Sequence, residues 1–154
     1  MSKPSKILVV DDDDVVRLSY QRSLKAANCN VEVETAPNGK DALKAMGEKP
    51  FDIVLLDLRM PGMDGMTVLK SIRRDWPASG VIIITGYPTI EGAKEAMRLG
   101  ACDYLAKPVS PAEIVNAATT AIAQKTWALR RCPADREPHS ATNDSSDEAS
   151  KLAS

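Results

Sequence analysis

Five candidate strands that alternate with amphipathic segments are the feature that most constrains how this chain folds. The strands are predicted at residues 6–10, 31–35, 52–56, 81–85 and 103–106, and the segments between them have helical periodicity. Strands that alternate with helices form a parallel sheet with helices on both faces. The sequence therefore predicts an α/β fold, a doubly wound parallel sheet of five strands with five helices.

Asp57 stands at the end of an uninterrupted, largely apolar run that begins at Phe51, and turn residues follow it. A run of this kind is typical of a strand that is buried on both faces. Its terminal carboxylate is then expected to emerge at an edge of the sheet, followed by a loop. That edge is where open α/β sheets place their ligands and their chemistry.

Helix signals support this division of the chain. Thr89 is placed to cap a helix that ends near Gly100, and residues 110–113 (SPAE) form a capping box with proline at the first helical position. The last helix is predicted to run to about Leu129, with apolar residues at helical spacing that pack on the sheet.

Length and composition limit the domain count and the partners. The chain has 154 residues, of which 44% are hydrophobic and only 4% aromatic, so it is predicted to hold one aliphatic core. A net charge of -1 gives no general electrostatic reason to bind nucleic acid or an anionic membrane. The first residues lack the apolar stretch of a signal peptide, and no run approaches the roughly 20 apolar residues of a membrane span. We expect a cytoplasmic protein.

Polar residues follow four of the predicted strands at the same end. Residues 11–14 (DDDD) follow the first strand, Asp57 ends the third, Thr85 ends the fourth and Lys107 follows the fifth. Clustered carboxylates repel one another unless a cation compensates their charge, and oxygen ligands without a His or Cys cluster favour Mg²⁺ over zinc. Lys107 and Thr85 suit phosphoryl oxygens, so transfer of a phosphoryl group to Asp57 is the inferred chemistry.

Each of these features also has a purely structural interpretation. An acidic run after a strand is commonly a helix cap and first turn, a threonine at a strand end is commonly a β-former, and a lysine before proline is commonly a surface residue. The functional interpretation depends on their combination at one edge of the sheet. Tyr104 is expected to be half-buried, with its hydroxyl in water.

The motifs in combination resemble the receiver domain of two-component response regulators. The resemblance rests on residues 6–12 (KILVVDD), 57–65 (DLRMPGMDG), 85–86 (TG) and 107–108 (KP), and it extends over residues 6–125. It implies that Asp57 accepts a phosphoryl group from the phosphohistidine of a sensor histidine kinase or a phosphotransferase.

The resemblance also implies a Mg²⁺ site and a switch. Asp12 and Asp57 would ligate the ion directly, Asp11 largely through water, and the backbone carbonyl of Arg59 would be a further ligand. By the resemblance, Thr85 and Lys107 would bind the phosphoryl oxygens, and Thr85 and Tyr104 would change position on phosphorylation and so act as the switch. It further implies the flavodoxin-like strand order 2-1-3-4-5 and a cis peptide before Pro108.

The neighbours of Asp57 bear on how long a phosphorylated state would last and on the alternative function. Arg59 and Tyr87 are bulky and are expected to flank the path of the attacking water, so we predict slow autodephosphorylation.

Haloacid-dehalogenase-like phosphatases also phosphorylate a strand-end aspartate, but they place a general acid two residues later, where this chain has Arg59.

The sequence also predicts where the receiver domain ends and how the chain would act. Residues 1–130 are predicted to form the receiver domain, and residues 131–154 a polar, disordered C-terminal tail with too little apolar surface for an output domain. A stand-alone receiver would act by binding a downstream effector protein, as a monomer or as a phosphorylation-dependent dimer. A fragment or descendant of a longer transcriptional regulator is the alternative.

Overall fold

The computed structural model of the protein describes residues 3–27 and 30–130. Contacts between Cα atoms divide the chain into two units, Met1–Ile122 and Ala123–Ser154. The first unit holds the sheet and all the residues of the candidate site. The described part of the second unit is the last portion of the final helix. The tail predicted at residues 131–154 lies outside the described residues.

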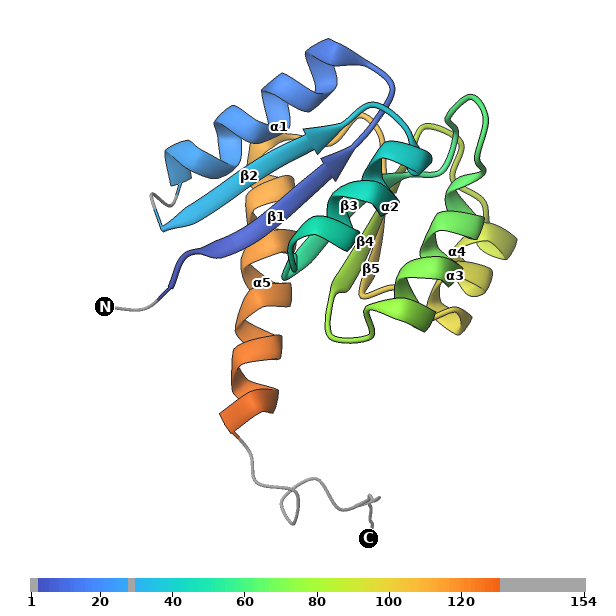
Figure 1. Ribbon diagram of the computed structural model, residues 1–154. Helices are drawn as coiled ribbons and strands as arrows, with labels where there is room; N and C mark the ends of the chain where they lie inside the picture. Colours follow the sequence, from blue (N-terminus) through green and yellow to red (C-terminus); the bar gives the residue numbers. More distant parts are fainter. Residues whose placement is uncertain (1–2, 28–29, 131–154) are drawn as a thin grey trace, which may run out of the picture. The chain divides into compact units, whose positions relative to one another are not determined.

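The sheet has five parallel strands in the order β2-β1-β3-β4-β5 (Figure 1). The strand order and the doubly wound α/β fold are as predicted. The strand bounds agree with the predicted ones to within one residue at each end, since the strands are β1 (Ser5–Val10), β2 (Val31–Ala36), β3 (Ile53–Asp57), β4 (Gly80–Thr85) and β5 (Asp103–Ala106).

Five helices connect and flank these strands in the part of the chain that the structure describes. The predicted helix cap at Thr89 is confirmed, because the Gly92 amide donates to the Thr89 hydroxyl at 2.8 Å. The capping box is also confirmed, because Ser110 N donates to the Glu113 carboxylate at 2.9 Å and Glu113 N donates to the Ser110 hydroxyl at 3.1 Å. The helices are α1 (Asp14–Ala27), α2 (Gly39–Glu48), α3 (Gly65–Asp75), α4 (Ile90–Arg98) and α5 (Pro111–Arg130).

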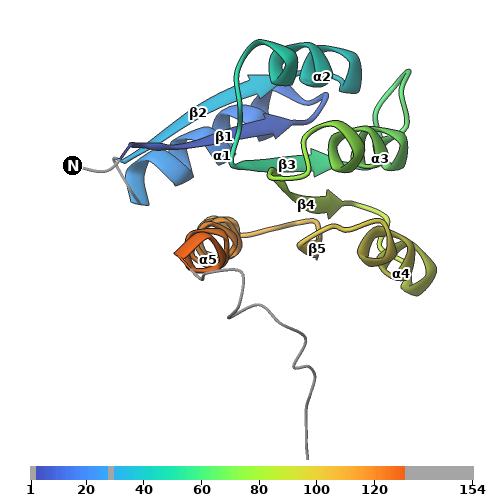
Figure 2. The ribbon, with the colours of Figure 1, turned by 60° about the horizontal axis from the view of Figure 1, so that its bottom comes forward.

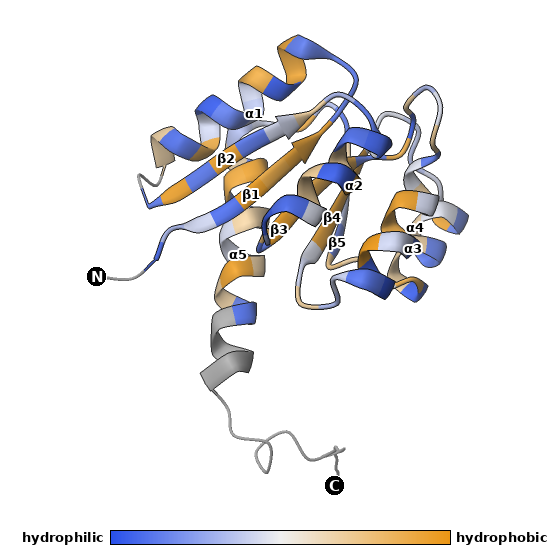
Figure 3. Ribbon diagram, in the orientation of Figure 1, coloured by the Kyte–Doolittle hydropathy of each residue, from blue (hydrophilic) through white to orange (hydrophobic). Residues whose placement is uncertain are grey.

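Two hydrophobic clusters cover the two faces of the sheet, as the alternation of side chains along a strand requires. One cluster joins alternate strand residues such as Leu56 and Ile83 to α2, α3 and α4. The other joins residues such as Leu55 and Ile84 to α1 and α5. Figure 2 shows the sheet between α2 and α5, and in Figure 3 the central strands are largely hydrophobic.

Strand register brings the ends of four strands to one edge of the sheet. Val10 of β1 pairs with Leu56 of β3, so Asp11 and Asp57 each come one residue after this pair. Asp57 pairs in turn with Ile84 of β4, and Thr85 pairs with Ala106 of β5. The residues that the sequence marks as polar strand ends therefore lie along one line across the sheet.

Candidate functional site

Three carboxylates meet at this edge. Asp11, Asp12 and Asp57 each offer one carboxylate oxygen, and these oxygens all lie within 4.8 Å of one another. Asp11 and Asp57 are 2% and 4% exposed, whereas Asp12 is exposed, so the group opens to solvent on the side of Asp12. The predicted convergence of these acids is confirmed. Oxygen donors alone suit a hard divalent cation such as Mg²⁺.

Within the acidic turn of residues 11–14, the side chains do different things. Asp11 accepts from the Asp13 amide at 2.9 Å, while Asp13 accepts from the Val15 amide at 2.8 Å and so caps α1. Asp14 pairs with Arg17. No hydrogen bond or ion pair to the carboxylate of Asp12 is seen among the residues that the structure describes. The capping interpretation of this run is thus correct for Asp13, while Asp11 and Asp12 belong to the carboxylate group.

Lys107 supplies a positive charge to this group from the loop after β5. Its ammonium lies 2.8 Å from Asp11 Oδ2 and 3.4 Å from Asp57 Oδ2. Burial opposes the charged form of Lys107, but the hydrogen bond to Asp11 and the charges of both carboxylates outweigh it and raise the pKa of the ammonium. The peptide bond before Pro108 is cis, as predicted.

The carboxyl group of Asp57 holds its proton more readily than an exposed aspartate. Burial is the main cause, and it raises the pKa of Asp57, as does the negative charge of Asp11. The Arg59 amide, which donates to Asp57 Oδ1 at 3.1 Å, and Lys107 act in the opposite direction but do not cancel the increase. Without a cation, the ionised form of Asp57 is therefore less favourable than the ionised form of an aspartate in water.

The loop after Asp57 depends on two glycines. Gly62 has a φ of +85°, which side chains rarely allow. A Cβ on Gly65 would lie 2.5 Å from the Cα of Leu58 and 2.7 Å from the backbone oxygen of Asp57. The first residue of α3 thus packs directly on the backbone of the acceptor strand. A cavity of about 400 Å³ opens beside this loop, lined by Leu58, Arg59, Met60, Gly62 and Asp64.

Thr85 and Tyr104 lie on neighbouring strands but contact different partners. Thr85 is 1% exposed, and its hydroxyl accepts from the Tyr87 amide at 3.1 Å. Tyr104 is partly buried, as predicted, and its hydroxyl accepts from the Thr89 amide at 3.4 Å, at the start of α4. The structure therefore places Tyr104 against the start of α4.

Arg59 and Tyr87 form a contact between two loops of this edge. The Arg59 guanidinium lies 4.1 Å from the centroid of the Tyr87 ring, a cation–π arrangement. Tyr87 itself is 64% exposed. The two bulky residues that the sequence places two positions after Asp57 and Thr85 thus contact each other.

Arg17 is a residue near the site that the sequence analysis did not identify. Its guanidinium donates to the backbone carbonyl of Asp11 at 2.6 Å. The signal that could have found it is its spacing, since Arg17 follows Asp14 by three residues in the first turn of a helix, where the two side chains share a face.

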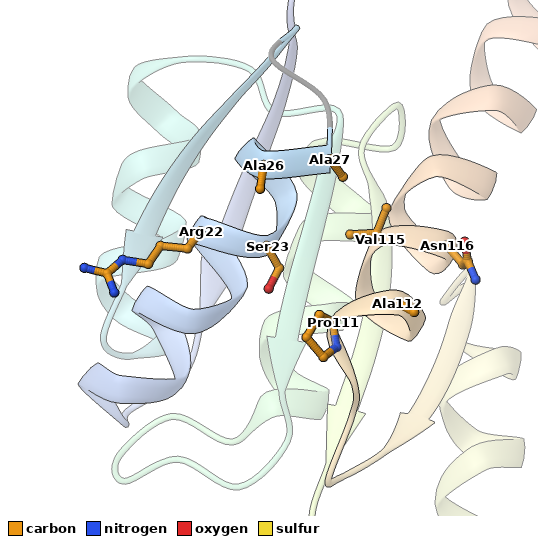
Figure 4. A pocket seen from close by; sticks show the side chains of 8 residues that line it. All are labelled: Arg22, Ser23, Ala26, Ala27, Pro111, Ala112, Val115 and Asn116. Carbon is orange, nitrogen blue, oxygen red and sulfur yellow. The ribbon is translucent and has the colours of Figure 1, made fainter.

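A separate groove of about 640 Å³ lies between α1 and α5 (Figure 4). It shares no residue with the carboxylate group, and most of its lining side chains are short, among them Ser23, Ala26, Ala27 and Ala112. Among the described residues, no helix has the length and apolar character needed to cross a membrane.

Regulators of transcription are among the known proteins with similar sequences. The chain is 40% identical over 116 residues to the DNA-binding transcriptional regulator NtrC of Escherichia coli K12, which covers 75% of this chain and 24% of that protein. It is 45% identical over 103 residues to the transcriptional regulatory protein ZraR of the same organism, covering 67% and 23%. The chain thus spans about a quarter of the length of the curated relatives it matches.

Solved structures with a similar fold include receiver domains. A CheY-like response regulator receiver domain protein from Methanospirillum hungatei superposes with a TM-score of 0.78 at 26% identity, over 82% of this chain and 99% of that one. The receiver domain of AraT, from Geobacillus stearothermophilus, gives 0.74 at 32% identity, over 82% and 98%. Residues 7–119 match the response regulator receiver domain family. The chain therefore belongs to this family, whose members are signalling phosphoacceptors of two-component systems rather than classical enzymes.

Proposed function

We propose that Asp57 accepts a phosphoryl group from the phosphohistidine of a sensor histidine kinase or a phosphotransferase, in a reaction that needs Mg²⁺. Receiver domains interact with histidine kinases, and an acidic triad is typical of their Mg²⁺ site. The observation that carries the proposal is the grouping of three carboxylates with one ammonium. Their oxygens lie within 4.8 Å of one another, and Lys107 contacts two of them. Membership of the receiver family decides against a haloacid-dehalogenase-like phosphatase.

In the transfer, a carboxylate oxygen of Asp57 forms a bond to phosphorus while the bond between phosphorus and the imidazole nitrogen breaks. The imidazole keeps the electron pair of that bond and takes up a proton. Bound Mg²⁺ would compensate the charge of the carboxylates and of the phosphoryl oxygens. The residues that would hold it are Asp11, Asp12, Asp57 and the backbone carbonyl of Arg59.

Lys107 and Thr85 would meet the phosphoryl group once it is on Asp57. Lys107 already lies 3.4 Å from Asp57, so its ammonium can pair with a phosphoryl oxygen after a small movement. Thr85 ends the neighbouring strand, and its hydroxyl can turn from the Tyr87 amide toward such an oxygen.

The output of this reaction would be a change in protein binding. Movement of Thr85 would free space for Tyr104 to leave the start of α4 and rotate inward, which would alter the face formed by α4, β5 and α5. An effector protein, or a second copy of the chain, would then bind this face with a different affinity. Receiver domains are typically cytoplasmic, and we place the chain there.

A receiver of a longer transcriptional regulator is the second candidate. Similarity to three regulators favours it, since this chain is 40–45% identical over the matched residues to NtrC, ZraR and AtoC, whose names all describe regulatory proteins. The first candidate would bind its effector as a separate protein, whereas the second would act on domains in the same polypeptide. Binding of the phosphorylated and unphosphorylated forms to separate effector proteins distinguishes the two.

Phosphorylation of the purified protein tests the proposed function. The protein is incubated with Mg²⁺ and acetyl phosphate, and its intact mass is measured before and after. We expect a gain of one phosphoryl group in the wild type, no gain when the Mg²⁺ is removed with a chelator, and no gain in Asp57→Asn. Phosphorylation that persists in Asp57→Asn would contradict the assignment of the acceptor.

A further inference from the structure

Arg17 connects two acceptors in the acidic turn. Its Nη1 donates to the backbone carbonyl of Asp11 at 2.6 Å, and its Nη2 pairs with the carboxylate of Asp14. The Arg17 side chain is only 15% exposed. A guanidinium holds its donors in one rigid plane, so these two contacts fix the distance between the first and the last residue of the turn.

The Arg17 contacts complete a set that surrounds Asp11. The Asp11 carbonyl is held by Arg17, one carboxylate oxygen by the Asp13 amide at 2.9 Å, and the other by Lys107 at 2.8 Å. Asp12 lies between the residues held in this way, and its own carboxylate has no hydrogen bond or ion pair among the described residues. Its position is therefore set by the backbone on either side of it.

We infer that Arg17 is a positioning residue of the divalent cation site, an inference that rests on the proposed function. Arg17 acts through the backbone of the turn and makes no contact with the cation. By holding the Asp11 carbonyl, it keeps the carboxylates of Asp11 and Asp12 directed toward Asp57. Residues that orient metal ligands in this way commonly contribute one or two orders of magnitude to metal affinity.

A purely electrostatic role for Arg17 predicts the opposite sign. A guanidinium that contacts the Asp11 carbonyl brings a positive charge to the turn that holds two of the carboxylates and repels a divalent cation, so its removal would tighten Mg²⁺ binding. Arg17→Lys separates the two roles, because lysine keeps the positive charge but cannot hold two acceptors in one plane. If only the charge mattered, Arg17→Lys would bind Mg²⁺ as the wild type does.

The test measures Mg²⁺ affinity by titration calorimetry for the wild type, Arg17→Ala, Arg17→Lys and Arg22→Ala. Arg22 is exposed on the same helix, so its replacement removes the same charge without touching the turn. We expect both Arg17 variants to bind Mg²⁺ on the order of tenfold more weakly and Arg22→Ala to be unchanged. Saturating Mg²⁺ should restore phosphorylation of Arg17→Lys by acetyl phosphate.

A local readout accompanies the affinities. The Asp13 amide, which donates to Asp11, should exchange its proton faster in the Arg17 variants than in Arg22→Ala, as measured by NMR without metal. Equal or tighter Mg²⁺ binding by Arg17→Lys would overturn the inference, and this variant decides the matter if Arg17→Ala does not fold. A wild type that fails to bind Mg²⁺ contradicts the proposed function instead, and the amide exchange rates then still decide whether Arg17 holds the turn.

Discussion

The two loops that follow the carboxylate-bearing strand ends, residues 11–14 after β1 and residues 58–64 after β3, are held in different ways. The first is an acidic turn held by hydrogen bonds between side chains and backbone, as the contacts of Asp11, Asp13 and Arg17 show. The second also has hydrogen bonds, from the Arg59 amide to Asp57 and from the Met66 amide to Asp64, but it depends in addition on close backbone packing, because Gly65 lies against the backbone of Leu58 and Asp57. Polar contacts alone hold the first loop, whereas the second also needs a position without a side chain.

This difference predicts how each loop responds to change. A loop held by side-chain hydrogen bonds loses one contact when one residue is replaced, and the others persist. A loop held by backbone packing has no room for an added atom, so one methyl group displaces a whole helix end. Single replacements in and around each loop test this difference.

Gly65→Ala should be the most damaging single change at the site. The new methyl group would lie 2.5 Å from the Leu58 Cα, an atom of the backbone that cannot move alone. We expect a loss of about 3 kcal/mol in the free energy of unfolding, measured with urea. Gly47→Ala in α2 is the matched control, since outside the neighbouring residues and backbone of its own helix no atom lies within 4 Å of the added carbon. There we expect a gain of about 1 kcal/mol. Equal effects of the two replacements would refute the role of close backbone packing at Gly65.

The four acids of residues 11–14 should separate into metal ligands and structural residues. Asp12→Ala removes a proposed ligand and is expected to weaken Mg²⁺ binding at least as much as the loss of a residue that orients a ligand, by roughly tenfold or more. Little change in stability is expected, because Asp12 is exposed and has no partner among the described residues. Asp13→Ala removes the cap of α1 and should cost about 1 kcal/mol of stability. Calorimetry and urea unfolding report the two quantities. If Asp13→Ala weakened Mg²⁺ binding as much as Asp12→Ala does, the division would be wrong.

Asp57→Asn should stabilise the protein in the absence of metal, by about 1 kcal/mol at neutral pH. The pKa of Asp57 is raised by burial in the folded protein above its ordinary value of 3.8. The stability that protonated Asp57 contributes is therefore fully present below pH 3.8 and is lost as the pH rises through the raised pKa of the folded protein. At neutral pH the buried charge is a cost that asparagine removes.

Urea unfolding as a function of pH checks this sign. The difference between Asp57→Asn and the wild type should grow as the pH rises from 3.8 and should shrink when Mg²⁺ is added, because the cation stabilises only the wild type. A variant that is less stable than the metal-free wild type at neutral pH would show that the Asp57 charge is already compensated by Lys107.

Arg59 and Tyr87 should give the smallest effect, on the lifetime of the phosphorylated state. Their contact lies across two loops and is worth about 0.5–1 kcal/mol at an exposed position. We expect Tyr87→Ala, and Arg59→Ala likewise, to speed autodephosphorylation about threefold. Loss of the phosphorylated mass with time measures the rate. An unchanged rate in both variants would show that water reaches Asp57 by another path.

Much of this fold and site could be predicted from the sequence, because both depend on patterns local to the chain. The run before Asp57 predicts a buried strand, and β3 is found at Ile53–Asp57. The capping box at Ser110 was likewise readable, since it needs only residues within one turn. The strand order and the cis bond before Pro108 were predicted through the family resemblance, not from these patterns.

Some contacts could not be predicted from the sequence, because they depend on side-chain rotamers and on the register between strands. Lys107 and Asp11 are 96 positions apart, and their approach to 2.8 Å depends on how four strands align. The choice of Asp13 as the helix cap, which leaves Asp12 unpaired, depends on where α1 begins. Periodicity does not fix such a boundary to one residue.

Which residues could take part in the chemistry follows from the sequence, because a parallel sheet brings the ends of its strands to one edge and Asp57, Thr85 and Lys107 all stand at such ends. What each residue does there depends on the packed fold. In the fold, Asp57 is buried beside Asp11, the Lys107 ammonium contacts both carboxylates, and Arg17 donates a hydrogen bond to the Asp11 carbonyl. The reason is physical, since burial, charge compensation and hydrogen bonding depend on distances between side chains that only the packed fold sets.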